Sequence, residues 1–294
     1  MLQFITSFYK GIYTILYRKG ISNLKTRILV AAVGLPLLLA VVLALPDWAT
    51  AILVAAMCVV AVYELLIGAG FCTQRRVAVY AACAAILVCF LSWRAQPPVY
   101  AMAAALVFFA ALFGEMLAAH AKLSFQSICA AVFAGLVLPY LLGALIRLRV
   151  MEHGKFFILT AFVLTMVPDS GAYFAGRAFG KHKLCPVISP HKTVEGAIGG
   201  VLSTVLFMAL YALVLQKAFD FQINYLYTVI YGILGAGASM LGDLSFSVIK
   251  RQAGIKDYGK LLPGHGGILD RFDSTTVVAP LVEVLLLTIP FATK

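Results

Sequence analysis

Apolar runs of about 20 residues follow one another along most of the chain and constrain its fold more than any other feature. A helix of that length crosses the roughly 30 Å hydrocarbon core of a bilayer. The runs are too long and too uniform for barrel strands, and a helix satisfies its own backbone in lipid. The sequence therefore predicts an all-α, polytopic integral membrane protein with about nine transmembrane helices. The runs cover residues 28–46, 49–68, 77–93, 98–118, 125–146, 156–176, 194–216, 223–249 and 275–292.

The composition supports this class, because 63% of the residues are hydrophobic and only 12% are charged. Soluble domains are about 45–50% apolar and about 25% charged. The net charge of +11 would fit a nucleic-acid partner, but basic residues of membrane proteins collect on the cytoplasmic side. Most of the 23 Lys and Arg residues fall on one side if the N-terminus is cytoplasmic. We therefore expect that orientation, with the C-terminus outside and no nucleic-acid partner.

The chain is predicted to form one membrane domain, residues 1–294, because it shows no soluble domain and no clear internal repeat. Aromatic and basic residues interleave in residues 1–27, which is typical of an interfacial segment rather than a span. Residues 156–294 are predicted to be the catalytic half. They contain both long polar connections, 177–193 and 250–274, and the expected topology places both in the cytoplasm.

Five carboxylates lie inside the apolar runs, where each would cost roughly 2.5–3.5 kcal/mol if it faced lipid. Asp169 and Asp243 lie about 10 Å from the cytoplasmic ends of their helices, at ~1.5 Å per residue. We therefore expect them to reach the same depth beneath the polar loops. Glu283 is interpreted as a neutral or hydrogen-bonded packing residue. A site role and a structural role are both open for Glu64 and Glu115.

The stretch from Ser247 to Asp273 concentrates charge between two apolar runs. Asp243, Asp270 and Asp273 are candidate ligands of a divalent metal, because Mg²⁺ prefers hard oxygen donors together with substrate phosphates. Asp270 and Asp273 would share one face of a helix that starts near Asp270. Basic residues surround these carboxylates as candidate counter-charges for phosphate: Lys250, Arg251, Lys256, Lys260 and Arg271.

Glycines and a histidine complete this stretch. Gly264, Gly266 and Gly267 would let backbone N–H groups approach an anion closely. His265 is a candidate for phosphate binding or proton transfer, and a loop-packing role is the alternative.

The other polar connection has features of an anion site. Pro168 and Gly171 are expected to loosen the helix near Asp169 and to expose backbone groups. Thr193 is the expected N-cap of the next helix, and Lys192 and Ser189 lie beside that helix N-terminus. We interpret Ser189, Lys192 and Thr193 as candidate substrate-binding residues.

Several site classes are excluded. The six cysteines form no CxxC pair and most lie in apolar segments, where cysteine behaves as a small hydrophobe. The sequence has no Walker A motif, and its His, Cys and carboxylate spacings do not match a zinc site. The residues alone thus indicate a metal-dependent membrane site that handles phosphate.

The order and spacing of the charged stretch resemble the signature of phosphatidate cytidylyltransferases, also called CDP-diacylglycerol synthases. The matching residues are Ser247-x-x-Lys250-Arg251, Lys256-Asp257 and Pro263-Gly264-His265-Gly266-Gly267-x-x-Asp270-Arg271-x-Asp273. Upstream, Asp169-x-x-Ala172-Tyr173 and Ser189-Pro190-x-Lys192-Thr193-x-Glu195-Gly196 are also similar to that family. The carboxyl-terminal half carries the resemblance, and the first ~120 residues match only as generic spans.

The resemblance implies an enzyme that condenses CTP with phosphatidic acid to CDP-diacylglycerol and pyrophosphate. It implies a homodimer in a bacterial cytoplasmic membrane, with the active site facing the cytoplasm, and Mg²⁺ with K⁺ as a second cation. By motif position, Asp243 and Asp270 would be metal ligands, and we expect Asp273 and Asp169 to support them. The basic residues and His265 would act at the phosphates, and Asp257 would orient a basic partner.

Three alternatives stay open. A CTP-dependent polyprenol kinase or a synthase of archaeal CDP-ether lipids would use similar residues. A transporter would also bury carboxylates, but it is more often built from paired broken helices in two repeats.

Overall fold

The computed structural model describes residues 23–94, 96–119, 123–259, 261 and 266–294. Within them, seven helices are long and apolar enough to cross a membrane. Each predicted apolar run contains a helix, and the only strands in the described part are four short ones in two antiparallel pairs. The all-α polytopic class is therefore confirmed. Of the predicted interfacial segment 1–27, only residues 23–27 are described, and they begin a helix.

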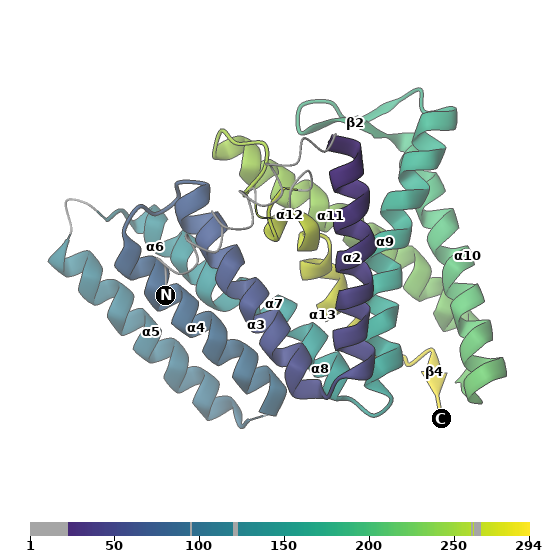
Figure 1. Cartoon of the computed structure of the whole chain (residues 1–294), viewed down its shortest axis with the longest axis horizontal. Helices are drawn as coiled ribbons and strands as arrows, with labels where there is room; N and C mark the ends of the chain where they lie inside the picture. The colour runs from purple at the N-terminus through teal and green to yellow at the C-terminus, as the bar shows by residue number, and fades with distance from the viewer. Residues whose placement is uncertain (1–22, 95, 120–122, 260, 262–265) are drawn as a thin grey trace.

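In the N-terminal half, the second, third and fourth described helices pack side by side in sequence order, and the segment 125–150 packs back against the third (Figure 1). A π-helical turn ends the second described helix, and a second π turn and Gly143 interrupt the predicted run 125–146. The elements are α2 (Asn23–Ala44), α3 (Asp47–Tyr63), η1 (Glu64–Gly68), α4 (Arg75–Arg94), α5 (Pro98–Ala118), α6 (Phe125–Val132), η2 (Phe133–Val137), α7 (Leu138–Leu142) and α8 (Ala144–Val150).

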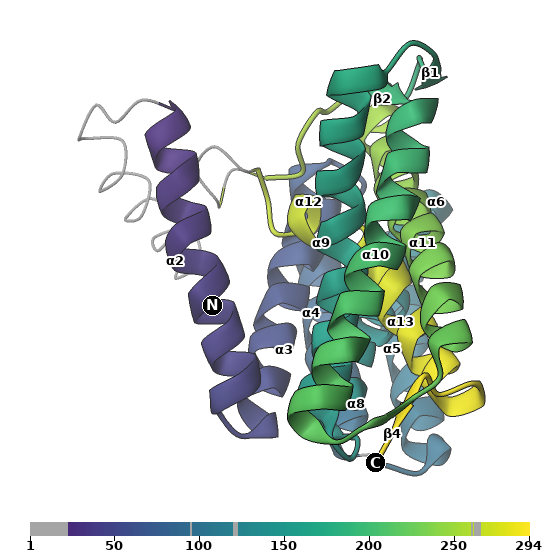
Figure 2. The same cartoon turned by 90° about the vertical axis from the view of Figure 1, so that its right-hand side faces the viewer.

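The C-terminal half is a bundle of longer helices (Figure 2). The hairpin β1–β2 and the short α12 lie toward one end of this bundle, and β3, β4 and the C-terminus lie toward the other. The elements are α9 (Gly154–Phe179), β1 (Lys183–Cys185), β2 (Ser189–Thr193), α10 (Val194–Phe219), β3 (Gln222–Ile223), α11 (Tyr225–Gln252), α12 (Leu269–Phe272), α13 (Thr275–Thr288) and β4 (Ala292–Thr293).

Helix α13 begins where its predicted run, 275–292, begins but ends four residues earlier, at Thr288. Its 14 residues extend only about 21 Å at ~1.5 Å per residue, less than a bilayer core. The count of nine spans therefore stays a prediction.

Small residues let α10 lie directly against α9, and this contact fixes the geometry of the C-terminal half. A Cβ at Gly200 would come within 2.9 Å of the Pro168 carbonyl oxygen, and one at Gly171 would overlap the Ser203 hydroxyl. The expectation that Pro168 and Gly171 loosen this helix is wrong, because α9 runs unbroken through both. The backbone of α9 at these two residues packs closely against α10. Gly171 is needed for that close approach and does not break the helix.

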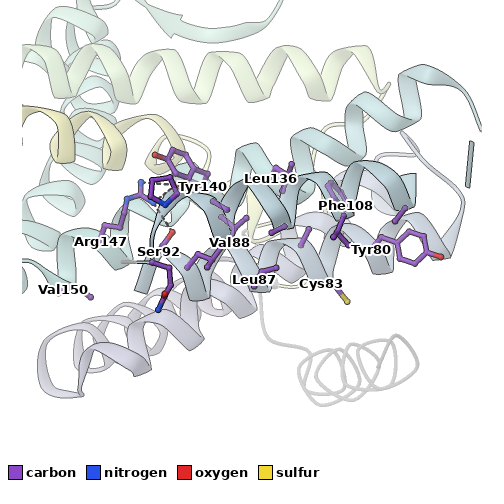
Figure 3. Close-up of a pocket in the computed structure, with 18 of the residues that line it drawn as sticks. Tyr80, Cys83, Leu87, Val88, Ser92, Phe108, Leu136, Tyr140, Arg147 and Val150 are labelled. Carbon is purple, nitrogen blue, oxygen red and sulfur yellow. Dashed lines mark hydrogen bonds between the residues drawn. The ribbon is translucent and has the colours of Figure 1, made fainter. Parts of the chain in front are cut away.

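A cavity of about 750 Å³ lies between α4, α5 and the segment η2–α8 (Figure 3). Its lining is mostly apolar, with Arg147 at one end beside Ser92 and Tyr140. Arg147 donates hydrogen bonds of 2.6 and 2.7 Å to the Glu283 carboxylate. The charge of Arg147 is therefore already neutralised, and Glu283 is the hydrogen-bonded packing residue that the sequence predicts.

Candidate functional site

A second cavity, of about 470 Å³, lies between α9, α10 and α11, next to strand β2. Asp169 from α9 and Asp243 from α11 both line it, which confirms the prediction that they reach a common depth. Lys192 of β2 also lines the cavity and forms an ion pair with Asp243. Residues from three separate segments thus bring two carboxylates and a lysine to one chamber.

The hairpin that carries Lys192 is fixed at its junction with α10. The Thr193 hydroxyl accepts the Gly196 N–H at 3.1 Å, so Thr193 is the N-cap that the sequence predicts. Glu195 accepts hydrogen bonds from the backbone N–H groups of Lys181 and His182, and its carboxylate lies 2.6 Å from the His182 ring. These bonds hold the two ends of the hairpin together and fix the position of Lys192 over the cavity.

The cavity lining also contains Arg177 and His191, two basic residues that were not among the predicted site residues. Arg177 lies in the last turn of α9 and His191 lies in β2. In the sequence, only their basic side chains within the predicted connection 177–193 could have marked them as site residues. Ser189, the third predicted substrate-binding residue of this connection, begins strand β2 and is absent from the lining.

Asp270 lies in a second cluster, at the base of the loop between α11 and α12. Its Oδ1 accepts a hydrogen bond from Lys250 Nζ at 2.9 Å. Its Oδ2 accepts the N–H groups of Tyr258 at 2.8 Å and Gly267 at 2.9 Å. Lys250 also lies 5.5 Å from the centre of the Tyr258 ring. The buried Asp270 carboxylate therefore joins the end of α11, at Lys250, to two parts of the loop, at Tyr258 and Gly267.

Lys250 connects the two clusters along α11. It lies two turns from Asp243, about 10 Å along the helix axis, on the same face. Between them, the Ser247 hydroxyl donates to Asp243 Oδ1 at 3.3 Å. One face of α11 thus presents a carboxylate to the cavity and a lysine to the loop.

Asp273 lies in the turn between α12 and α13, next to both clusters. Its Oδ1 accepts the Ser274 N–H at 2.7 Å. A Cβ on Gly242 would lie 2.8 Å from the Asp273 carbonyl oxygen, so this backbone rests against α11 next to Asp243. Burial, together with the charge of Asp243, raises the pKa of Asp273 to about 7. A cation beside these groups would offset the cost of holding both carboxylates ionised.

Most of the remaining predicted site residues are exposed loop residues, and two lie outside the described part of the chain. Arg251 is exposed and donates to the Ile255 carbonyl at 3.2 Å. Lys256, Asp257 and Arg271 are exposed, and Gly266 has a φ of +86°, which favours glycine. Gly267 donates its N–H to Asp270, so the loop backbone already holds a carboxylate of the protein itself. Gly264 and His265 lie outside the described residues.

No three His, Cys, Asp or Glu residues in the described part of the chain lie close enough together to form a metal site on their own. Mg²⁺ commonly takes only one or two carboxylates and completes its shell with water and substrate phosphate. The oxygen donors of Asp169, Asp243 and Asp273 fit that chemistry.

The bundle of apolar helices with a charged cavity toward one end is that of a polytopic integral membrane protein. Comparison with known proteins adds the family. The model of the cytidylyltransferase family matches residues 25–289. The chain therefore belongs to the cytidylyltransferase family.

Three curated relatives carry the name phosphatidate cytidylyltransferase. The Staphylococcus epidermidis protein is 47% identical over 136 residues, 46% of this chain and 51% of the relative. The Staphylococcus aureus protein is 42% identical over 146 residues, 50% of this chain and 55% of the relative. The Haemophilus influenzae protein is 41% identical over 150 residues, 49% of this chain and 52% of the relative. The matched part of the chain thus spans about half the length of these relatives.

Proposed function

We propose that this protein transfers the cytidylyl group of CTP to phosphatidic acid, giving CDP-diacylglycerol and pyrophosphate. The observation that carries the proposal is the cavity in which Asp169, Asp243 and Lys192 meet between three membrane helices. Membership of the cytidylyltransferase family and the names of the relatives support the same reaction. The chamber offers charge for a triphosphate and lies among helices that lipid surrounds.

In this reaction the phosphate of phosphatidic acid attacks the α-phosphorus of CTP and pyrophosphate leaves. The attacking group is already an anion, so the chain needs no strong general base. Its residues act by positioning and by neutralising charge. Lys192, with Arg177 and His191 in the same lining, is placed to bind phosphate oxygens. Three exposed basic residues would attract the two anionic substrates from the loop side: Arg251, Lys256 and Arg271. Lys250, the fourth proposed counter-charge, is buried in its pair with Asp270 and would act on phosphate only by leaving that pair.

Mg²⁺ is the cation that this set of donors fits best, with K⁺ as a second cation. We propose Asp243 as a ligand, supported by Asp273 and Asp169. Asp270 is the second proposed ligand, and because its oxygens bind Lys250, Tyr258 and Gly267 in the neighbouring cluster, it would have to exchange the Lys250 bond for the cation. When bound, Mg²⁺ would neutralise the triphosphate and make pyrophosphate a better leaving group. Asp257 would orient a basic partner, and His265 would bind phosphate or move a proton.

The proposal includes the arrangement in the membrane. Nine spans, a cytoplasmic N-terminus and the distribution of Lys and Arg would place the hairpin and the α11–α12 loop in the cytoplasm, where CTP is available. Both lie toward the same end of the bundle, which supports this topology. We further propose a homodimer in a bacterial cytoplasmic membrane.

The test is substrate-dependent pyrophosphate release by purified, monodisperse protein. The wild type should release pyrophosphate only with CTP and phosphatidic acid together, and Asp243→Asn and Asp270→Asn should each lose about 100-fold or more, the usual scale for a lost charge-stabilising group. Glu115→Gln serves as the control, because Glu115 is a carboxylate of α5 that bonds Tyr80 and does not line the cavity. Near-normal turnover in the Asp variants would reject their assigned role, and dependence on a polyprenol or an ether lipid in place of phosphatidic acid would reject the substrate.

A further inference from the structure

Glu64 is a buried carboxylate in the N-terminal half that reaches the loop carrying Asp270. It begins the π turn η1, and only 1% of its surface is exposed. Its Oε1 accepts the Ile268 N–H at 3.1 Å and its Oε2 accepts the Leu269 N–H at 2.9 Å. These donors lie 204 and 205 residues away along the chain. Both oxygens of the Glu64 carboxylate thus accept hydrogen bonds from two adjacent backbone N–H groups.

The loop is shaped to admit this carboxylate. A Cβ at Gly259 or at Gly267 would overlap the Glu64 side chain. On the other side of the contact, a Cβ at Gly68 would lie 2.8 Å from the Tyr258 carbonyl oxygen. Glycine on both surfaces therefore lets η1 and the loop approach more closely than other residues would allow. The extra residue that a π turn inserts re-aims side chains, and such turns are frequent at functional sites.

Glu64 and Asp270 accept hydrogen bonds from three consecutive backbone N–H groups. Gly267 donates to Asp270, and the next two residues, Ile268 and Leu269, donate to Glu64. Asp270 follows directly and also holds the Tyr258 N–H. The segment that carries Asp270 is therefore clamped from η1, and releasing that clamp would let Asp270 move relative to Lys250.

We infer that Glu64 is a positioning residue: it holds Asp270 in place for the reaction by binding the two N–H groups before it. The inference rests on the proposed function for its catalytic consequence and on the hydrogen bonds for its structural one. Glu64 touches backbone alone in this contact, and its effect on the substrates passes through Asp270.

Glu64→Gln is the sharpest variant, because it keeps the shape of the side chain. The amide oxygen can still accept one N–H, but the amide NH₂ then faces the other donor, so one hydrogen bond is lost. The matched control is Glu115→Gln, which replaces a carboxylate of the same half that bonds Tyr80 at 2.9 Å and lies away from the loop.

The first measurement is amide hydrogen exchange in the wild type and both variants, in detergent and without substrates. In Glu64→Gln we expect exchange at Ile268 and Leu269 to accelerate about ten- to a hundredfold, the scale of a lost bond to a charged group. Exchange at Tyr258, which bonds Asp270 and not Glu64, should accelerate too. Unchanged exchange at all three amides, or acceleration confined to Ile268 and Leu269, would overturn the positioning role.

The second measurement is steady-state kinetics on the monodisperse fraction of each variant. We expect kcat of Glu64→Gln to fall about tenfold or more, with a smaller change in KM for phosphatidic acid, because a displaced Asp270 weakens stabilisation that is needed mainly in the transition state. Wild-type kcat in folded Glu64→Gln would overturn the inference. If the wild type itself forms no CDP-diacylglycerol, the proposed function fails, and the exchange at Tyr258 still decides whether Glu64 positions Asp270.

Discussion

Replacing Lys250 by methionine tests the buried ion pair on which the loop cluster depends. The two side chains are 11% and 2% exposed, and Lys250 Nζ lies 2.9 Å from Asp270 Oδ1. At an effective dielectric constant of ~20 the gross attraction at this distance is about 6 kcal/mol. Breaking a buried pair by removing one partner typically costs about 3–5 kcal/mol. Asp270 keeps two backbone N–H donors, so we expect the lower end, about 3 kcal/mol.

The assay is equilibrium unfolding in mixed micelles of mild detergent and SDS. Lys256→Met is the matched control, because Lys256 is an exposed lysine of the same loop, and it should change the unfolding free energy by less than about 0.5 kcal/mol. The double variant Lys250→Met/Asp270→Asn should lose about 2 kcal/mol less than the sum of its single variants, as coupled residues do. A loss below 1 kcal/mol for Lys250→Met, or additive single losses, would refute the pairing.

Two further predictions concern the backbone around the cavity. Gly242→Ala should destabilise the protein by about 1–3 kcal/mol and lower activity, because its Cβ would press on the Asp273 carbonyl 2.8 Å away. Gly237→Ala on the same helix meets nothing within 4 Å and should be neutral or slightly stabilising in the same unfolding assay; equal effects at both positions would contradict the close contact. Thr193→Ala should cost about 1 kcal/mol and raise KM for CTP by loosening the hairpin, whereas Thr193→Ser, which retains the hydroxyl that caps Gly196, should restore both. Failure of serine to restore KM would show that the cap does not position this strand.

The sequence predicts the helices well because the length and apolar character of each run set the helix directly. The helical rise then places Asp169 and Asp243 at one depth, and the structure confirms that they share a cavity. The cap at Thr193 is equally local, since the hydroxyl and the Gly196 N–H are three residues apart. These features depend on residues near one another in the chain.

Contacts between segments far apart in the chain could not be predicted from the sequence. The contact of Glu64 with Leu269 joins residues 205 apart, so the sequence could show a buried carboxylate but not its partner. Helix α9 runs unbroken through Pro168, where glycines of α10, a separate segment, pack against it. Asp270 carries a lysine and two N–H groups, and only the folded loop brings these donors together.

Cytidylyl transfer at the cavity between α9, α10 and α11 can be tested by following the phosphorus of CTP. Purified wild-type protein and Asp243→Asn are incubated with phosphatidic acid and CTP labelled at either the α- or the γ-phosphate, and lipid and water-soluble products are separated. We expect α-label to enter the lipid and γ-label to leave as pyrophosphate with the wild type, and neither transfer to occur with Asp243→Asn. Transfer of γ-label to the lipid would identify a kinase instead, and full α-label transfer by Asp243→Asn would place the reaction outside this cavity.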